Sequence, residues 1–530
     1  MQKDKTYLAL LLTGLLTGCG LDSGSGENND IQSKSQSDPI GRWIYGDMHV
    51  HSTASDGHNL MTTVLDKAFN DYGASYITST DHSGFNAYKI NDALVRTTVD
   101  GQLILNPAPE EEVHSHDYAK ENYPDDKAEV ERSELINTLY SHVNQYRQRL
   151  NTSQYLLQGM EWTIPYTKEH ATLLILDDGN LDSLAAFHQQ YAKGNGNSKE
   201  LEDNLNAVKE LEHNHNGKAI FAFNHPSRSH KVKIEDIRQF HNAAPTAFIG
   251  MEGAPGHQRN EESRGSYDET DPIIMDEYQD YGIAYFGQTY GGFDYMTARL
   301  GGVWDALLSE GRHFSIISQS DFHSQTKDFW PNQYAKTHML LETESREGVI
   351  NALKKGNIFV THGDLISALT FNVSSHDAAA TMGETLAVPL GDNIKVSIEI
   401  TQSEINHNGD TPQLAFVDVI VGEVTAYKDE QDSDFNKPFS DSTRILASFS
   451  EGDEGWNIQD GKIRIEMSLP QDHGDMYIRL RGSNNAKGTP GYVDEQGNPI
   501  IDLEKQEHSV EAMAWKDLWF YSNAIFISTQ

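Results

Sequence analysis

The chain has 530 residues, which is enough for a barrel-sized enzyme domain and a smaller second domain. Its 79 acidic residues outnumber the 41 basic ones, and the formal net charge of −38 repels polyanions, which argues against long nucleic acids as ligands. The only cysteine is Cys19, so the sequence excludes an intramolecular disulfide and a thiolate metal cluster. Any metal ligands must therefore be histidines and carboxylates.

Residues 1–19 have the pattern of a bacterial lipoprotein signal peptide. Two lysines precede an apolar run at residues 7–16, which is too short to span a bilayer. The run leads into Leu-Thr-Gly-Cys, which resembles a lipobox and implies that Cys19 is diacylated. A free cysteine near an ordinary cleavage site is the alternative. We expect an exported lipoprotein anchored to a membrane through Cys19, and Gly20 is compatible with sorting to an outer membrane.

The residues that follow divide into a linker and two folded domains. Residues 20–40 are rich in Ser, Gly, Asn, Asp and Gln and cannot bury enough apolar surface to fold, which predicts a flexible linker. Between residues 41 and 362, short apolar runs alternate with amphipathic stretches, as in sheets built from βα units. The predicted strands are residues 43–50, 75–80, 155–163, 172–176, 219–223, 247–251, 283–286 and 314–318.

One helix is well defined in this first domain, at residues 61–72. Asn59 is a candidate N-cap, and Gly73 is expected to end the helix. Residues 86–132 are charged and irregular, and we interpret them as a solvated insertion, with a lid over the active site as the alternative. The apolar face of the helix consists of Met61, Val64, Leu65, Ala68, Phe69 and Tyr72.

Beyond residue 362 the sequence changes its period. Apolar residues alternate with polar ones at residues 394–400, 463–469 and 476–480, which is the two-residue repeat of half-buried antiparallel strands. We therefore expect an α/β domain followed by an antiparallel β-sandwich at residues 363–530. The sandwich carries no binding motif, so we interpret it as structural support for the first domain.

Histidines and carboxylates follow five of the predicted strands. His49 and His51 end the first strand, and residues two apart in a strand point the same way, so both imidazoles can face one metal ion. Thr80-Asp81-His82 follows the second strand, and Gly159-Met160-Glu161 lies in the third. A carboxylate such as that of Glu161 can bridge two cations.

The later motifs extend the same pattern. His170 begins the fourth predicted strand region, Asn224-His225-Pro226 follows the fifth, and Asp321-Phe322-His323 follows the last. Each motif alone fits a surface or core histidine better than a ligand. Together, in this order and at strand ends, they predict a metal site at the edge where barrel enzymes place their active sites.

These motifs together resemble the successive motifs of the polymerase and histidinol phosphatase (PHP) superfamily. The resemblance covers residues 41 to about 362. Within the superfamily the chain is similar to a secreted branch related to carbaryl hydrolase, on residues 351–356 and 359–363. Residues 159–163 followed by His170 also resemble another exported branch.

The resemblance implies a distorted (β/α)7 barrel that holds two or three divalent ions, zinc, manganese or iron, at its mouth. Some relatives carry a histidine where this sequence has Asp56, and here His58 follows two residues later. The metal ligands that the resemblance implies are His49, His51, Asp56, His82, Glu161, His170, His225, Asp321 and His323.

A metal-bound hydroxide at such a site attacks phosphoryl or carbonyl groups. We expect a phosphoesterase, either a phosphatase or a phosphodiesterase, that acts on a small exported or scavenged molecule. The same chemistry serves a carbamate, ester or amide hydrolase, or an exonuclease on short oligonucleotides, and these remain alternatives. A non-catalytic, metal-stabilised binding module is an alternative of a different class.

Three residues outside the ligand set are candidates for catalysis. Asp81, together with Asp47, is expected to orient ligand histidines by bonding the free ring nitrogen. Arg228, just past the fifth motif, can clamp a phosphate oxygen or pair with a surface carboxylate. His257 is a candidate proton donor, with His230 as its alternative.

Overall fold

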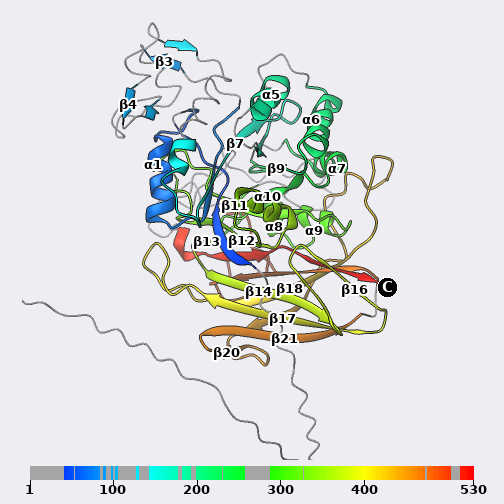
Figure 1. Ribbon diagram of the computed structural model, residues 1–530. Coiled ribbons are helices and arrows are strands. Elements are labelled where there is room, and N and C mark those ends of the chain that lie inside the picture. The colour runs from blue at the N-terminus through cyan, green and yellow to red at the C-terminus, as the bar shows by residue number, and fades with distance from the viewer. Residues whose placement is uncertain are drawn as a thin grey trace, which may run out of the picture. The chain divides into compact units, whose positions relative to one another are not determined.

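In the computed structural model, one 15-stranded sheet extends through the chain on both sides of residue 362 (Figure 1). The strands lie in the order β11-β10-β9-β8-β7-β2-β1-β12-β13-β23-β22-β18-β19. Strands β16 and β24 lie off this path: β24 pairs with both β22 and β16. The chain is therefore a mixed α/β protein with large sheets, as the sequence predicts.

The structure describes most of the chain from Gly41 onward. The signal peptide with Cys19, the linker, the predicted strand at residues 283–286, His230 and His257 lie outside the described residues. Of the segment 86–132 the structure describes only strand backbone: β3 (Tyr88–Ile90) pairs with β6 (Lys127–Glu129), and β4 (Thr97–Val99) pairs with β5 (Gln102–Ile104). The other described residues are 41–52, 54–83, 143–176, 182–192, 199–228, 231–256, 287–325, 328–471, 474–502 and 514–530.

The first half of the long sheet consists of strands that the sequence predicts. Strands β7 and β9 have the predicted bounds. The parallel pairs β1-β2, β2-β7, β9-β10 and β10-β11 end at a common edge. The strands are β1 (Arg42–Asp47), β2 (Tyr76–Ser79), β7 (Tyr155–Thr163), β8 (His170–Ile175), β9 (Ala219–Phe223), β10 (Phe248–Pro255) and β11 (Ser315–Gln319).

Strand β8 departs from the parallel arrangement expected of βα units. It is antiparallel to both β7 and β9. Residues 164–169 are too few to form the crossover that a parallel neighbour needs, so the chain turns straight back. As a result, the first residue of β8, His170, lies opposite Thr163 at the carboxyl ends of the other strands.

The structure does not show the closed barrel that the sequence led us to expect. Strand β11 ends the ladder, and no strand pairing joins β11 to β1 among the described residues; an isolated bridge between Val50 and Phe322 lies just beyond the ends of these strands. A hydrogen bond from the His51 backbone N–H to the Phe322 carbonyl lies beside this bridge. Strand β1 instead pairs with β12 (Ala335–Leu341), which pairs with β13 (Ile358–His362).

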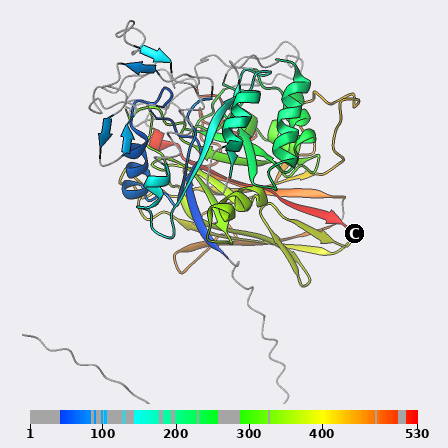
Figure 2. The ribbon, with the colours of Figure 1, turned by 45° about the horizontal axis from the view of Figure 1, so that its top comes forward.

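Helices cover the first half of the sheet (Figure 2). Helix α5 contacts β8, α6 contacts β9, and α10 contacts β12 and β7. None of the helices in the described part of the chain is both long enough and apolar enough to cross a membrane. The bounds are α5 (Asp182–Tyr191), α6 (Leu201–His213), α7 (Ile234–Ala243), α8 (Tyr295–Ala298), α9 (Val303–Leu308) and α10 (Arg346–Lys355).

The predicted helix at residues 61–72 consists of α1 (Met61–Asp66) and a π-helical turn (Lys67–Asp71). Its predicted apolar face is buried except for the half-buried Tyr72. Gly73 follows with a φ of +64°, a conformation that favours glycine and ends the helix. The predicted N-cap was wrong: Leu60 occupies that position without a side-chain bond, and Asn59 is buried behind it.

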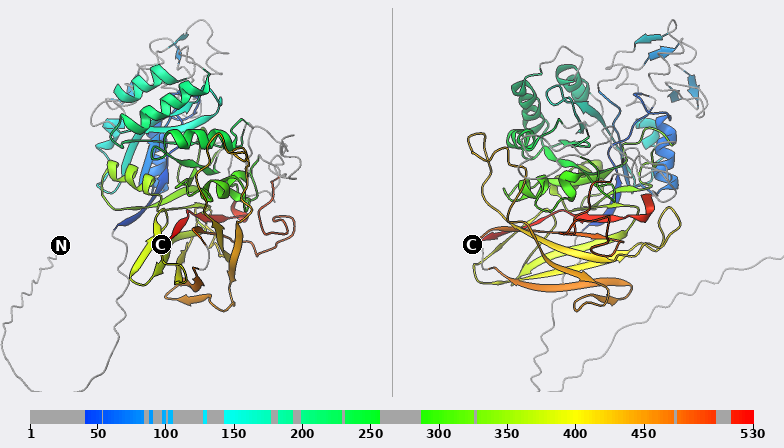
Figure 3. Two further views of the ribbon diagram at one scale, coloured as in Figure 1. Left: turned by 90° about the vertical axis from the view of Figure 1, so that its right-hand side faces the viewer. Right: turned by 180° about the vertical axis from the view of Figure 1, so that it is seen from behind.

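The second half of the chain forms two facing sheets (Figure 3). An antiparallel five-stranded sheet, β15-β14-β17-β21-β20, packs on the far end of the long sheet through a shared apolar core. The strands are β14 (Ile366–Ser375), β15 (Ala378–Thr381), β16 (Thr385–Val388), β17 (Asn393–Gln402), β18 (Phe416–Glu423), β19 (Arg444–Ser450), β20 (Asn457–Gln459), β21 (Lys462–Pro470), β22 (Met476–Ser483), β23 (Trp519–Ser522) and β24 (Ile525–Thr529).

The expected boundary after residue 362 lies inside the long sheet. Strand β13 pairs with β23, so the ladder passes from the first half of the chain to the second without a break. Residues 41–530 form one compact unit. The change of sequence period at this point therefore marks a second sheet that packs against the long one.

Strand β22 is buried on both faces, whereas its alternation predicts a half-buried strand. Its polar face carries Arg479, which makes two 2.7 Å bonds to the carboxylate of Asp305 in α9. Tyr477 donates to the same carboxylate at 3.0 Å, and the guanidinium lies 4.7 Å from the ring centroid of Trp304. These contacts pair the buried charge of Arg479, which the sequence pattern assigns to solvent.

We expect Asp305→Ala to lower the free energy of unfolding by about 3–5 kcal/mol, because it leaves Arg479 buried without its carboxylate partner. Urea unfolding followed by circular dichroism measures this loss. The control is Asp441→Ala, which breaks the exposed Lys437–Asp441 pair and should cost less than about 0.5 kcal/mol. Equal losses in the two variants would contradict the importance of the buried pair.

Candidate metal centre

The carboxyl edge of the first-half strands gathers all nine ligands that the family resemblance implies. His49 and His51 follow β1, and His82 follows β2. Glu161 lies near the end of β7, and His170 begins the reversed strand β8 beside it. The remaining ligand residues come from the ends of β9 and β11 and from the turn after His51: His225, Asp321, His323 and Asp56.

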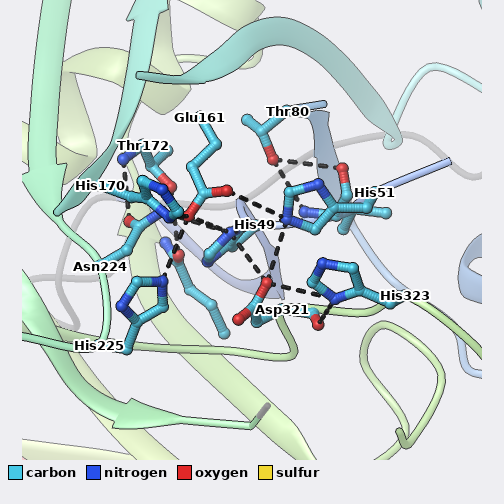
Figure 4. Close-up of polar contacts among 12 residues, drawn as sticks. His49, His51, Thr80, Glu161, His170, Thr172, Asn224, His225, Asp321 and His323 are labelled. Atoms are coloured by element: carbon cyan, nitrogen blue, oxygen red, sulfur yellow. Dashed lines mark hydrogen bonds and ion pairs between the residues drawn. The ribbon is translucent and has the colours of Figure 1, made fainter. Parts of the chain in front are cut away.

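The carboxylate of Glu161 lies at the centre of this cluster (Figure 4). Its side chain is fully buried, and the Asn224 amide donates to Oε1 at 2.9 Å. Imidazole nitrogens surround both oxygens. The nearest nitrogen–oxygen distances are 2.6 Å for His82, 3.0 Å for His49 and for His170, 3.3 Å for His225 and 3.4 Å for His51.

Two further carboxylates lie on either side of Glu161. Oδ1 of Asp321 is 3.0 Å from His49 Nε2 and 3.1 Å from His51 Nε2. Asp56 lies 3.3 Å from His82 Nε2 and 3.4 Å from His323 Nε2. Each of these four imidazoles therefore lies within 3.4 Å of a carboxylate oxygen.

This donor set fits divalent cations. The Nε2 atoms of His49 and His51 are 3.0 Å apart and share the same carboxylate neighbours, so their lone pairs converge. Glu161 Oε2, Asp56 Oδ1 and His170 Nδ1 are buried and make no hydrogen bond to the described residues despite the short distances. Cations between these atoms would satisfy them, so the buried groups can bind metal.

Three overlapping groups of ligand atoms are close enough to hold an ion. The groups combine nitrogen with carboxylate oxygen, as zinc, manganese and iron sites do. Asp56 belongs to the first group, while His58 belongs to none of them. The groups are His51, Asp56, His82 and His323; His49, His51 and Glu161; and His82, Glu161 and His170.

Burial and neighbouring charges set the protonation of the imidazoles. Burial and nearby imidazoles lower the pKa of His51 to about 3, so this ring is neutral and offers a lone pair. Burial opposes a proton on His82, but Asp56 and Glu161 outweigh it and raise the pKa to about 9. Asp56 likewise outweighs burial at His323 and raises its pKa to about 10. In the metal-free protein, protons on these two rings balance the carboxylates.

Two ligand residues adopt backbone conformations that side chains usually avoid. His225 has a φ of +28° and Asp321 a φ of +48°. Such a conformation costs about 1–3 kcal/mol per residue and persists only where neighbouring contacts hold it. Strain at two ligand-bearing turns is typical of a functional site.

The carboxylates of Asp47 and Asp81 accept hydrogen bonds from backbone N–H groups, and Asp81 also accepts from serine hydroxyls. The prediction that Asp47 orients an imidazole was wrong: its carboxylate accepts from the backbone N–H groups of His49 and Ser320. Asp81 accepts from the Ser52 N–H at 2.8 Å and from the Ser55 hydroxyl at 2.7 Å, so it orders the turn after His51. The Ser55 oxygen lies 3.4 Å from His51 Nδ1, which makes the effect on that ring indirect.

Arg228 lies at the rim of the centre, beside a buried carboxylate. Its Nη2 is 3.7 Å from Glu169, and its side chain is 16% exposed. Lys231 approaches the other oxygen of Glu169 at 3.6 Å. This geometry fits the carboxylate-paired arginine that the sequence left as an alternative to the phosphate clamp. His257, the candidate proton donor, has no described position.

Sequence reasoning missed two buried carboxylates that contact ligand histidines. Glu252 in β10 lies 2.6 Å from His49 Nδ1, and Glu169 lies 3.5 Å from His225 Nδ1. Glu252 directly follows the predicted strand at residues 247–251, so it carried the same strand-end signal as the other motifs. Glu169 precedes His170 in a turn and gave no such signal.

Metal affinity is expected to increase as the pH rises from about 6.5 to about 9. His82 and His323 hold protons below their raised pKa values, and a bound ion must displace those protons. Each displaced proton contributes about tenfold in affinity per pH unit. Competition with a chromogenic chelator across this range measures the slope, and a flat profile would contradict the protonation described.

Comparison with known proteins provides no relative that informs this centre. No protein-family model matches the chain, and no curated protein matches it. Among solved structures, a crystal structure of a chitin binding domain from Burkholderia pseudomallei is similar over 28% of this chain and 57% of that chain, with 11% sequence identity and a TM-score of 0.14. So low a similarity supports no conclusion on fold or function.

Proposed function

We propose that the protein is a metal-dependent hydrolase that cleaves phosphate esters of small molecules. The observation that carries this proposal is the convergence of five imidazoles on the buried Glu161 carboxylate, with Asp56 and Asp321 beside them. Bound divalent cations lower the pKa of a coordinated water and offset negative charge on the attacked group. Two or three ions, of zinc, manganese or iron, fit the overlapping ligand groups.

Three of the candidate ligands are partly exposed, which supports catalysis over a purely structural metal site. The side chains of Asp56, His323 and His170 are 25%, 17% and 13% exposed, while that of Glu161 is fully buried. A structural metal site is closed by its protein ligands, whereas a catalytic site keeps positions for water and substrate. This partial exposure therefore argues against the non-catalytic binding module.

Two cationic side chains at the rim support an anionic substrate. Arg228 and Lys231 flank Glu169 next to the candidate ligand His225. The two cations exceed the single negative charge of Glu169, and because the chain as a whole is strongly acidic, bound ions would supply most of the positive charge that a phosphate needs. A carbamate, ester or amide lacks that charge, which is why we place these substrates second.

The proposal extends to the fold and the location of the protein. We propose that β1 to β11 with their helices are a distorted (β/α)7 barrel of the PHP type, supported by the common edge at which their candidate ligands lie. We also propose an exported lipoprotein anchored through Cys19, on the evidence of the signal-peptide pattern alone.

The first test uses the full-length protein, stripped with chelator and reloaded with manganese or zinc. We expect metal-dependent hydrolysis of p-nitrophenyl phosphate, of bis(p-nitrophenyl) phosphate, or of both, and their ratio distinguishes a phosphatase from a phosphodiesterase. Protein that has metal bound but cleaves neither ester would reject the phosphoesterase proposal. Carbamate, ester and amide substrates would then be tested, with the binding module next.

Replacement of a central ligand should remove metal and turnover together. We expect His49→Ala and Asp321→Ala to abolish hydrolysis and lower the metal content, because both residues contact the shared part of the cluster. Metal analysis of the purified variants beside the same ester assay measures both effects. The matched control is His376→Ala, whose exposed ring pairs with Asp392 in the second half of the chain and should change neither quantity. A variant of either ligand that keeps metal and activity would contradict the site.

A further inference from the structure

From the contacts of Glu252 we infer that it is a positioning residue, which joins the candidate ligands His49 and His225 into one half of the metal centre. The inference rests on the proposed metal dependence, but not on any particular substrate. It assigns a role to a buried carboxylate that is itself outside the three groups able to hold an ion.

Both oxygens of Glu252 are used, and each serves a different strand. Oε1 lies 2.6 Å from His49 Nδ1, and Oε2 accepts from the backbone N–H of His225 at 2.6 Å. The residue is fully buried, and neither oxygen is left without a hydrogen bond among the described residues. One carboxylate in β10 therefore links the end of β1 to the end of β9.

The contact with His49 determines which ring nitrogen faces the cluster. A carboxylate only accepts hydrogen bonds, so His49 Nδ1 carries the proton and donates it. Nε2 is then the nitrogen directed at Glu161 and Asp321, each 3.0 Å away. By donating to an anion, the imidazole also becomes a more basic ligand.

The contact with His225 fixes the backbone of a strained turn. The φ of +28° at His225 is maintained only by specific contacts, and its N–H bond to Glu252 is one of them. The orientation of this turn places the ring, whose Nε2 lies 3.3 Å from Glu161 Oε1. Glu252 thus sets the positions of two imidazoles that approach the same oxygen.

The other half of the centre is built differently. His51 Nδ1 has the neutral hydroxyl of Ser55 at 3.4 Å and the Asp56 carboxylate at 3.8 Å in place of a close buried anion. The group of His51, Asp56, His82 and His323 uses no contact with Glu252. The two halves should therefore respond differently to the loss of the Glu252 charge.

Glutamine at position 252 cannot reproduce both contacts. With its oxygen toward His49, its NH2 group faces the His225 N–H, and that bond is lost. With its NH2 group toward His49, the ring proton must move to Nε2, where it blocks the lone pair that the cluster needs. Either orientation weakens the same half of the centre.

The experiment titrates metal-free Glu252→Gln and wild-type protein with manganese alone, by chelator competition, and measures bound metal by elemental analysis. For some of the bound manganese ions we expect the affinity to fall about 10–100-fold. The other ions should bind with nearly wild-type affinity. We expect the melting temperature of the metal-free variant to stay near that of the metal-free wild type, which separates positioning from folding.

Glu310→Gln is the matched control. Glu310 is also a buried carboxylate with two partners, Arg238 and Arg312, away from the candidate ligands. This variant should melt at a lower temperature and bind manganese like the wild type.

Two results would overturn the inference: Glu252→Gln that binds all its metal with wild-type affinity, or one that loses every ion together with the stability of the metal-free fold. If wild-type protein binds metal but hydrolyses no ester, the phosphoesterase proposal is rejected. The manganese titration still tests the role of Glu252 in that case.

Discussion

The structure of the centre depends on one buried charge, the carboxylate of Glu161 in the middle of the carboxyl edge. An ionised carboxylate costs several kcal/mol to bury unless cationic groups or hydrogen-bond donors surround it. Five imidazoles from four strands and the Asn224 amide meet that need. Burial raises the pKa of Glu161, but His170, His82 and His49 outweigh the burial and hold this pKa well below its usual value. Each strand must therefore keep its register for the others to be satisfied.

The long sheet supplies that register from both halves of the chain. Strand β1, which His49 and His51 directly follow, has β2 on one side and β12 on the other, and β12 leads through β13 to β23. The second half thus supports the edge of the sheet that holds the centre. Its strands β14, β17 and β21 share an apolar core with strands of the long sheet.

Periodicity predicted the strands beside which the cluster lies, and the strand-end motifs, through the family resemblance, gave the candidate ligands, because both depend on local sequence. Local sequence does not predict contacts between distant segments. The reversal of β8, the isolated bridge in place of a closed ladder, and the burial of Arg479 against Asp305 all depend on which strands become neighbours. Asn59 shows the same limit, since Leu60 occupies the N-cap position and the Asn59 side chain is buried. The role of Glu252 needed the position of β10 beside β9.

The pairing of β13 with β23 has a consequence for how the chain acquires its structure. Strand β13 ends at His362, and its partner β23 begins at Trp519. During synthesis, one edge of β13 therefore stays unpaired until the distant segment that forms β23 has been made. Pairings of such long sequence separation form slowly and expose an unpaired, apolar edge in the meantime. Until β13 and β23 pair, the exposed edge of β13 must be protected from aggregation.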